Sequence, residues 1–395
     1  MKQKIVLLFA LLVFVGNYLF AQQQPSPQKI AILAPLYLDS AFNDYSYQLG
    51  DRYIPQYIIT GLDFYNGVML AVDTLQKEHA NIEVWVYDTK KKSEDINTIL
   101  KGMAVQNFSL IIASLNNTDE QKAVSDFSFN YNIPVISATY PNDANVTDNP
   151  FFILLNSTLK THVDGIFDYV QQKYSNAKPV FITRNEPLES RILADYKFND
   201  SAFFNKKYRK LTLNNDEVSI NNLTPFLDST KTNVLVCGSL NTTFASNLAK
   251  TLCENPQYKT TLIGMPDWDG VRLLNKMDCS SLEIIYSTPY NYSRTDSIGY
   301  NISEAYRDKF YTRPSDMVYK GYEAMYHFTH LLLDYQYDFI NHLSENRYVI
   351  ANNFDIRPIM LQDSSFVPAY MENQNLYFVK KINGLVVSVT NFTKH

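Results

Sequence analysis

The chain has 395 residues, of which 46% are hydrophobic, and its 35 basic and 40 acidic side chains give a formal net charge of −5. It is therefore long and apolar enough to bury a large core in two domains of ordinary size. The mildly acidic balance excludes an electrostatic reason to bind nucleic acid or an anionic membrane surface.

The first 21 residues have the layout of a secretory signal peptide. Lys2 and Lys4 precede an unbroken apolar run at 5–15, and a polar segment follows Ala21. The run is too short to span a bilayer comfortably. We expect cleavage near Ala21, a periplasmic mature chain and no membrane insertion after cleavage. An uncleaved N-terminal anchor is the alternative.

The first half of the chain alternates short apolar strands with helices. Continuous apolar runs predict buried strands, and apolar residues at helical spacing predict the helices between them. Thr118, followed three residues later by Gln121, predicts a capping box. This alternation indicates a parallel sheet covered by helices, the doubly wound arrangement. The strands are expected at 29–37, 82–89, 108–114 and 133–138, and the helices at 61–79, 94–106 and 118–130.

The pattern then restarts, which predicts a second α/β unit. The tail from 348 to 393 loses helical periodicity, and 375–389 is typical of a β-hairpin turning at Asn383-Gly384. The strands of this half are expected at 178–184, 233–239, 260–265 and 282–289, with helices at 160–173 and 245–253.

One internal repeat supports two related lobes. "LIIASLNNT" at 110–118 and "VLVCGSLNTT" at 234–243 are each a buried strand, then Ser-Leu-Asn, then a threonine suited to cap a helix. Loops at the carboxyl ends of parallel strands line the crevice where ligands bind. Two such loops, one per lobe, are expected to face each other across a cleft.

Signatures of catalysis and of cofactor binding are missing. The sequence has no GxSxG elbow, Walker loop or GxGxxG after a strand. We therefore expect no enzyme and no cofactor. The best metal candidate is a helical stripe, which we interpret instead as the solvated back of an amphipathic helix. Its members are Glu323, His327, His330 and Asp334.

The three cysteines are too few for a disulfide scaffold. Cys237 ends an apolar strand and is expected to be a buried thiol. Whether Cys253 and Cys279 pair is left open by the sequence.

Polar and aromatic residues gather in the loops that follow the predicted strands. Hydroxyls, amides and aromatic faces at the mouth of a rigid sheet suit a small-molecule site. Any single one of them is better explained as a turn or cap former, so the prediction concerns the set. The expected ligand-binding residues are Tyr37, Ser114, Asn116, Asn117, Thr118, Ala138, Thr139, Tyr140, Arg184, Ser239, Asn241, Trp268 and Tyr290.

The two repeated loops differ in charge. Asp119 and Glu120 occupy the first turn of the helix predicted at 118–130. Acidic side chains there compete with an anionic ligand for the positive end of the helix dipole. A ligand carboxylate or phosphate is therefore better tolerated on the second lobe.

Five segments, taken in order, resemble the type I periplasmic binding proteins, which include branched-chain amino acid-binding proteins and the ligand-binding regions of related receptors. The resemblance covers nearly the whole mature chain, and its most telling pieces are the strand at 133–142 and the helix after "RPSDMV". The segments are "KIAILAPL", "YNGVMLAVDTLQ", "IPVISATYPN", "NPFFILLNSTLKTHVDGIFDYV" and "YRDKFYTRPSDMVYKGYEAMYHFTHLL".

The resemblance implies two α/β lobes joined by three crossovers, with a ligand held between lobes that close like a hinge. It places the carboxylate and amine of an amino acid at Ser114 to Thr118 and Ser137 to Tyr140. The acidic residue that contacts the amine early in the second lobe has no clear counterpart near Lys160. The implied lobes are 28–157 plus 288–345, and 158–287 plus 346–393.

Two functions remain open. The first is an exported solute-binding protein that hands a small polar, amino acid-like ligand to a membrane permease or receptor. The second is an envelope scaffold that contacts protein or peptidoglycan through a degenerate cleft.

Overall fold

The computed structural model describes residues 26–44, 46–50, 53–198, 202, 206–276, 278–291, 297–361 and 366–392. The expected signal peptide at 1–21 lies outside these residues. Among the helices that are described, none has both the length and the apolar character needed to cross a membrane.

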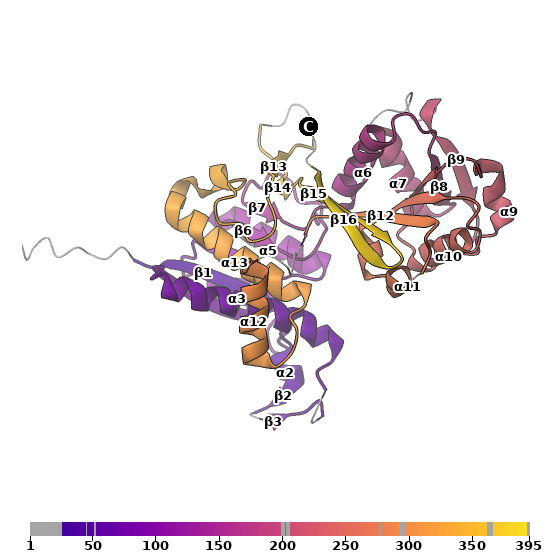
Figure 1. Cartoon of the computed structure of the whole chain (residues 1–395). Coiled ribbons are helices and arrows are strands. Elements are labelled where there is room, and N and C mark those ends of the chain that lie inside the picture. The colour runs from indigo at the N-terminus through magenta and orange to yellow at the C-terminus, as the bar shows by residue number, and fades with distance from the viewer. Residues whose placement is uncertain are drawn as a thin grey trace, which may run out of the picture.

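Two seven-stranded sheets organise the chain into two lobes (Figure 1). Parallel pairs form most of each sheet, which confirms the expected pair of doubly wound lobes. The first sheet has the order β13 (Ile356–Ile359), β14 (Tyr370–Asn373), β7 (Phe152–Leu154), β6 (Val135–Ser137), β5 (Leu110–Ala113), β1 (Gln28–Ala34) and β4 (Ile82–Asp88). The second has the order β16 (Leu385–Phe392), β15 (Leu376–Ile382), β12 (Leu282–Thr288), β11 (Thr260–Gly264), β10 (Asn233–Cys237), β8 (Val180–Arg184) and β9 (Arg209–Leu213).

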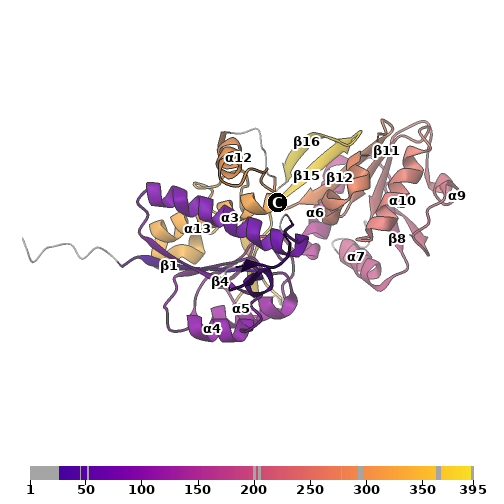
Figure 2. The same cartoon turned by 90° about the horizontal axis from the view of Figure 1, so that it is seen from below.

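Helices cover both faces of the first sheet. Figure 2 shows α3 (Gln56–Lys77) and α13 (Asp316–Tyr335) on one face, and α4 (Ile96–Met103) and α5 (Thr118–Tyr131) on the other. Alternate residues of a strand point to opposite faces, so Ile32 packs in the first of these cores and Leu33 in the second. Further elements of this lobe are α2 (Leu38–Ala41), β2 (Phe42–Asn43), β3 (Ser46–Tyr47), α12 (Ser297–Phe310) and η3 (Gln336–His342).

Two glycines let α3 and α13 approach closely. A Cβ at Gly67 would overlap the carbonyl of Val318, and a Cβ at Gly321 would overlap that of Phe64. This reciprocal contact fixes α13 against the first sheet. The start of α13 is thereby held in a fixed position in its lobe.

The second lobe has one continuous core around its sheet. Strands β10 and β11 are buried along their whole length, as continuous apolar runs predict. Its helices are α6 (Leu159–Lys173), α7 (Pro187–Phe198), α9 (Ile220–Leu223), η1 (Thr224–Phe226), α10 (Thr242–Cys253), η2 (Pro266–Gly270) and α11 (Arg272–Lys276).

The tail divides between the lobes, contrary to the expected assignment of 346–393 to the second lobe. β14 pairs parallel to β7, and β13 pairs antiparallel to β14, so 356–373 extends the first sheet. Only the hairpin of β15 and β16 joins the second sheet. The predicted turn is confirmed, because Asn383 and Gly384 both have positive φ (51° and 69°), as a two-residue hairpin loop requires.

The chain passes between the lobes three times: after β7, after β12 and between β14 and β15. Buried hydrogen bonds tie these passages together. Ser157 Oγ donates to the carbonyl of Asn373 (2.7 Å), and the Thr158 amide donates to Glu372 (2.6 Å). The Asn291 amide donates to the side chain of Asn352 (2.5 Å), in the loop before β13, and the Asn375 side chain of the third passage donates to the carbonyl of the adjacent Asn353 (2.8 Å). The three crossovers therefore form one packed hinge.

Glu323 on α13 anchors this hinge. Its buried carboxylate accepts bonds from the amides of Ala351 and Asn352 (3.2 and 3.1 Å) and from the Asn352 side chain (2.7 Å). Burial raises the pKa of Glu323, although these hydrogen bonds act in the opposite direction. The carboxylate thus supplies the acceptors that a buried chain segment needs.

We predict that Glu323→Ala destabilises the protein by about 3 kcal/mol, because the change leaves several buried donors without an acceptor. Chemical denaturation of the full chain measures the loss. Glu304→Ala, at a surface ion pair with Arg307, is the control and should change the free energy of unfolding by less than about 0.5 kcal/mol. An E323A protein as stable as wild type would contradict this account of the hinge.

Candidate functional site

The carboxyl edges of the two sheets meet. Tyr290, just after β12, donates from its hydroxyl to the carbonyl of Ala138, just after β6 (2.8 Å). Tyr290 itself packs in the core of the first lobe, so this bond places the carboxyl end of β12 beside that of β6, and parallel strands bring the other carboxyl ends of each sheet to the same edge. We use the name junction for residues 138–140, 266–269, 286–290 and 316–320.

The first-lobe loops after β5 and β6 are brought together as expected. Thr139 Oγ1 donates to the carbonyl of Leu115 (2.9 Å) and to Ser114 Oγ (3.3 Å). Thr118 Oγ1 and the Tyr140 hydroxyl lie 3.2 Å apart. These side chains satisfy one another in this conformation, and a ligand role for them stays a prediction.

The helix cap is one residue away from the expected position. Asn117, not Thr118, caps α5 by accepting from the Glu120 amide (2.9 Å), and Asn241 caps α10 by accepting from the Phe244 amide (2.8 Å). The expected capping box is wrong, since the Gln121 side chain donates instead to the carbonyl of Asn142. Asn116, which precedes the cap, is exposed.

The two repeated loops are structurally equivalent, but their structural alignment is shifted by one residue from the alignment of the repeated Ser-Leu-Asn sequence. The Ser114 amide bonds to Leu33 of β1, and the Gly238 amide bonds to Ile182 of β8, both at 2.8 Å. Ser114 thus occupies the place of Gly238 and not that of Ser239. Each loop leaves its strand in the same way and runs into a helix capped by asparagine.

Tyr37 lies at the carboxyl end of β1, in a backbone nest that is already filled. Asp88, the last residue of β4, accepts from the amides of Leu36, Tyr37 and Leu38 (2.9, 3.1 and 2.8 Å). Three convergent amides form an anion site, and here the chain supplies the carboxylate. A ligand anion would have to displace Asp88.

In the second lobe, Arg184 is occupied by acids of its own lobe. Its Nε and Nη2 donate to Glu189 (3.1 and 2.5 Å), and its Nη1 donates to Asp216 (2.6 Å). Ser239 Oγ donates to the same Glu189 oxygen (2.7 Å), and Asn241 Nδ2 donates to Asp216 (3.4 Å). These partners argue against the expected ligand role of Arg184 and Ser239 and favour a structural one.

Burial works against the ionisation of Glu189, but hydrogen bonds from Arg184 and Ser239 outweigh it and lower the pKa of that carboxyl. The side chain of Glu189 is 2% exposed. The cluster is therefore an ion pair sealed at the ends of β8 and β10.

η2, after β11, contains two of the buried polar atoms that lack a hydrogen-bond partner among the described residues; the others belong to Thr89, Glu120, Ser128, Arg209, His327 and Asp355. Trp268 is fully buried, and neither its indole Nε1 nor the buried Oδ1 of Asp267 has a hydrogen-bond partner among the described residues. Burial raises the pKa of Asp267 to about 7. A buried acceptor beside a buried donor, at the junction, is the arrangement of a site that awaits a ligand.

Asp267 was missed as a candidate, although its loop was recognised. The sequence shows an acid after an apolar strand, and only packing shows that one of its oxygens is buried without a partner. The acidic residue expected early in the second lobe therefore has a candidate later in that lobe. At the opposite side of the junction, Lys320 places its ammonium 4.3 Å from the ring centroid of Tyr290.

The expected metal stripe on α13 is not a solvated face. Glu323 and His327 are 2% and 0% exposed, and His330 contacts Glu78 (2.9 Å). Asp334 accepts from Tyr348 (2.7 Å). Glu323, His330 and Asp334 therefore each bond to a separate partner and do not converge on one point. Among the described residues, no three histidine, cysteine or acidic side chains form a metal-binding group.

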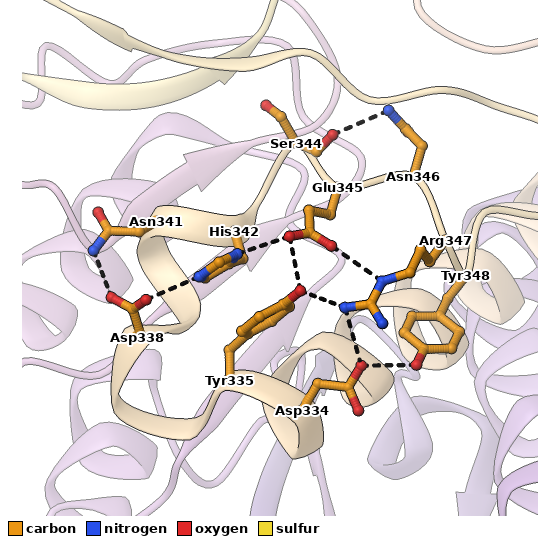
Figure 3. A network of polar contacts seen from close by, with 10 residues as sticks. All are labelled: Asp334, Tyr335, Asp338, Asn341, His342, Ser344, Glu345, Asn346, Arg347 and Tyr348. Atoms are coloured by element: carbon orange, nitrogen blue, oxygen red, sulfur yellow. Dashed lines mark hydrogen bonds and ion pairs between the residues drawn. The ribbon is translucent and has the colours of Figure 1, made fainter.

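A polar network lies at the C-terminal end of α13 (Figure 3). His342 stacks on Tyr335 (centroids 3.5 Å apart) and contacts Glu345 and Asp338 through its two ring nitrogens, each at 2.8 Å. Hydrogen bonds to Glu345 and Asp338 raise the pKa of His342. Bonds from Tyr335 and His342 lower the pKa of Glu345 to about 2.

The cysteines are all free in this structure. Burial raises the pKa of Cys237, as expected of a buried thiol. Cys253 Sγ lies 3.8 Å from the carbonyl of Asp278, which precedes Cys279, so the half-buried Cys253 is a neighbour of the segment that carries the buried Cys279.

Surface cavities lie away from the junction. One of about 650 Å³ is lined by Arg209, Phe226 and Asn233, and another of about 760 Å³ lies between α3 and β4. Neither is lined by a residue of the expected ligand set.

Three solved structures similar to this chain are described as binding proteins of transporters. The substrate binding protein LivJ of a branched-chain amino acid transporter from Streptococcus pneumoniae, in complex with isoleucine, has a TM-score of 0.54 at 14% identity and covers 93% of this chain and 100% of its own. A branched chain amino acid ABC transporter periplasmic ligand-binding protein from Burkholderia xenovorans has a TM-score of 0.59 at 12% identity, with 92% and 95% covered. A solute binding protein of an ABC transporter from Rhodopseudomonas palustris, in complex with 3,4-dihydroxy benzoic acid, has a TM-score of 0.51 at 16% identity, with 93% and 98% covered.

These likenesses confirm the type I periplasmic binding protein fold that the resemblance implies. No family model matches the sequence, and no curated protein matches it.

We predict that Arg184→Met lowers the free energy of unfolding by about 3 kcal/mol, because it leaves the charge of Glu189 buried without a cation. Chemical denaturation measures the change. The double variant R184M/E189Q should recover part of the loss, since it removes both charges. An R184M protein within about 1 kcal/mol of wild type would show that Arg184 is free for another role.

We predict a pH-dependent contribution from the network of Figure 3. The pKa of His342 is raised above 6.5 in the folded chain, so its contribution is fully present below pH 6.5 and is lost as pH rises through the folded pKa. The pKa of Glu345 is lowered, so its contribution is lost as pH falls from 4.5 towards 2.

Melting temperatures of wild type and His342→Gln between pH 5 and pH 9 test this. The difference between the two proteins should be largest below pH 6.5 and should shrink at higher pH. His79→Gln, at an exposed histidine outside the network, is the control for the loss of a histidine side chain. A constant difference for H342Q would contradict the assignment.

Proposed function

We propose that the chain is an exported solute-binding protein that captures a small, amine-bearing, amino acid-like ligand between its lobes and presents it to a permease or receptor. Support for export comes from the signal-like residues 1–21, and support for solute capture comes from the fold of the compared transport proteins. The proposal includes no catalysis, no metal and no cofactor.

The observation that carries the proposal is Asp267. Leaving a buried polar atom unpaired costs about 1–3 kcal/mol, so Oδ1 stabilises the bound state if a ligand supplies its donor. An amine does so and restores the ionised carboxylate at the same time. Trp268 Nε1, in the same turn, offers a donor to a second ligand atom.

The remaining ligand set is proposed around this acid. From the first lobe it keeps Ser114, Asn116, Thr118 and the 138–140 turn, which lies beside Tyr290. Hinge closure would bring these loops over a ligand held at η2, and contacts to both lobes favour the closed state. Tyr37, Asn117, Arg184, Ser239 and Asn241 take part in internal bonds and play a supporting role.

An envelope scaffold is favoured by a different observation. β16 is an edge strand that exposes Leu385, Val386 and Val387 and carries no charge. Unprotected edges of this kind pair with other strands. The two functions separate experimentally, because a scaffold would bind protein through β16 and would gain no stability from small ligands.

We predict that thermal denaturation of the mature chain with single amino acids at millimolar concentration raises its melting temperature for at least one of them. Asp267→Asn should abolish that shift and leave the unliganded protein at least as stable as wild type, because the change removes a desolvated charge. Asp278→Asn, at an exposed acid of the same lobe, should retain the shift. A panel without any shift would sink the proposal.

The affinity of the responding amino acid should also depend on pH. Only the ionised form of Asp267 pairs with an amine, and its pKa is about 7. Affinity measured by calorimetry should therefore fall about tenfold from pH 8 to pH 6. An equal affinity at the two pH values would place the amine elsewhere.

A further inference from the structure

The first lobe offers a ligand anion few open donors. The start of α5 is capped by Asn117 and has Glu120 in its first turn, paired with Lys90 (2.5 Å). The amides of residues 36–38 already hold Asp88. Both positive helix ends near the carboxyl edge are thus neutralised by the chain itself.

Cations of the second lobe are also engaged. Arg184 is neutralised by Glu189 and Asp216. Lys381 donates to Asn275 (2.7 Å) and lies 3.7 Å from Asp269. Neither offers an open charge to a ligand at the junction.

Lys320 differs from these cations. Its ammonium lies over the face of Tyr290, and the described residues give it that ring but no hydrogen-bond acceptor and no carboxylate within ion-pair distance. The nearest acids are Asp316 on its own helix and Asp269 of η2, whose charges raise its pKa, while burial lowers it to about 8. An ammonium has three donors, so Lys320 retains hydrogen-bonding capacity at the junction.

The position of Lys320 is fixed by the structure around it. α13 is held against α3 by the close approach of Gly67 to Val318 and of Gly321 to Phe64. Tyr290, on which the ammonium rests, is itself held by its bond to Ala138. A cation–π contact keeps the ammonium in place without using its donors, which preorganises it for an anion.

We propose that Lys320 binds a carboxylate of the ligand, and that it makes Asp267 and Lys320 a pair of opposite charges on opposite lobes that selects a zwitterion. This inference rests on the proposed function. It also differs from what the resemblance implies, which places the carboxylate on the loops at 114–118 and 137–140. Each charge of the ligand then neutralises one charge of the protein, so closure buries no net charge.

The experiment compares each amino acid that stabilises the wild type with its carboxamide, which keeps the amine and removes the anion. Dissociation constants are measured by calorimetry at pH 7 for the full mature chain and for Lys320→Met, Lys320→Arg, Asp267→Asn and Lys122→Met. Lys122 is an exposed lysine of α5 paired with Asp126, and its variant is the matched control.

For Lys320→Met we expect a loss of about 10- to 100-fold for the amino acid, the range for a hydrogen bond to a charged group, and an unchanged affinity for the carboxamide. The unchanged carboxamide shows that the variant is folded. Lys320→Arg should recover most of the lost affinity, and Lys122→Met should behave as wild type.

Three results would overturn the proposal or its premise. Lys320 does not bind the carboxylate if K320M weakens the binding of the amino acid and of its carboxamide equally. The same conclusion follows if Thr139→Ala, measured in the same way, weakens the amino acid alone and K320M does not. In either case, loss of binding in D267N would still support the solute-binding function. If no amino acid or carboxamide binds the wild type, the proposed function and the role of Lys320 both fall.

Discussion

The hydrogen bond from Tyr290 to Ala138 joins the two carboxyl edges on which the rest of the site depends. Parallel pairing gathers the strand-end loops of each lobe along one edge, but it does not bring the lobes together. The packed hinge does so, because three chain passages share buried amide and carboxylate partners. The loops after β6, β11 and β12 then become neighbours although they are far apart in sequence.

Within that frame, most polar groups at the carboxyl edges are satisfied by the chain itself. Asparagines cap α5 and α10, Asp88 accepts bonds from the backbone amides after β1, and Arg184 donates to acidic side chains of its own lobe. Internal saturation makes the loops rigid and leaves few atoms with unmet bonding capacity. Buried atoms without a partner also lie on Thr89 and Glu120 in the first lobe, but Asp267, Trp268 and Lys320 combine unmet bonding capacity with a place at the junction and are therefore the more informative about the ligand.

Much of the fold could be predicted from the sequence because central parallel strands are continuous apolar runs. β1, β5, β10 and β11 follow directly from this pattern. β9 is an edge strand in which exposed residues alternate with less exposed ones, so its sequence is a weaker indication of a strand. The sequences of β13 and β14 gave no indication of the sheet that these strands join. β14 is placed in the first sheet by its pairing with β7, more than 200 positions away, and the edge strand β13 joins the sheet only through β14.

The site was harder to predict for a related reason. Local pattern located the strand-end loops, but it misplaced the cap by one residue and assigned Glu323 to a solvated face. Glu323 is buried because 350–352 folds over it, and Asp267 matters because its oxygen is sealed by packing. Both facts arise from tertiary contacts that spacing does not contain.

The chemistry of the hinge has a consequence for ionic strength. Its joints are hydrogen bonds among amides, hydroxyls and carboxylates that are buried or partly buried, whereas the proposed capture of a zwitterion begins with a charged ligand that approaches through solvent. Dissolved salt screens the second kind of interaction strongly and the first hardly at all. Added electrolyte should therefore slow the encounter with a ligand while leaving the intrinsic swing of the lobes unchanged.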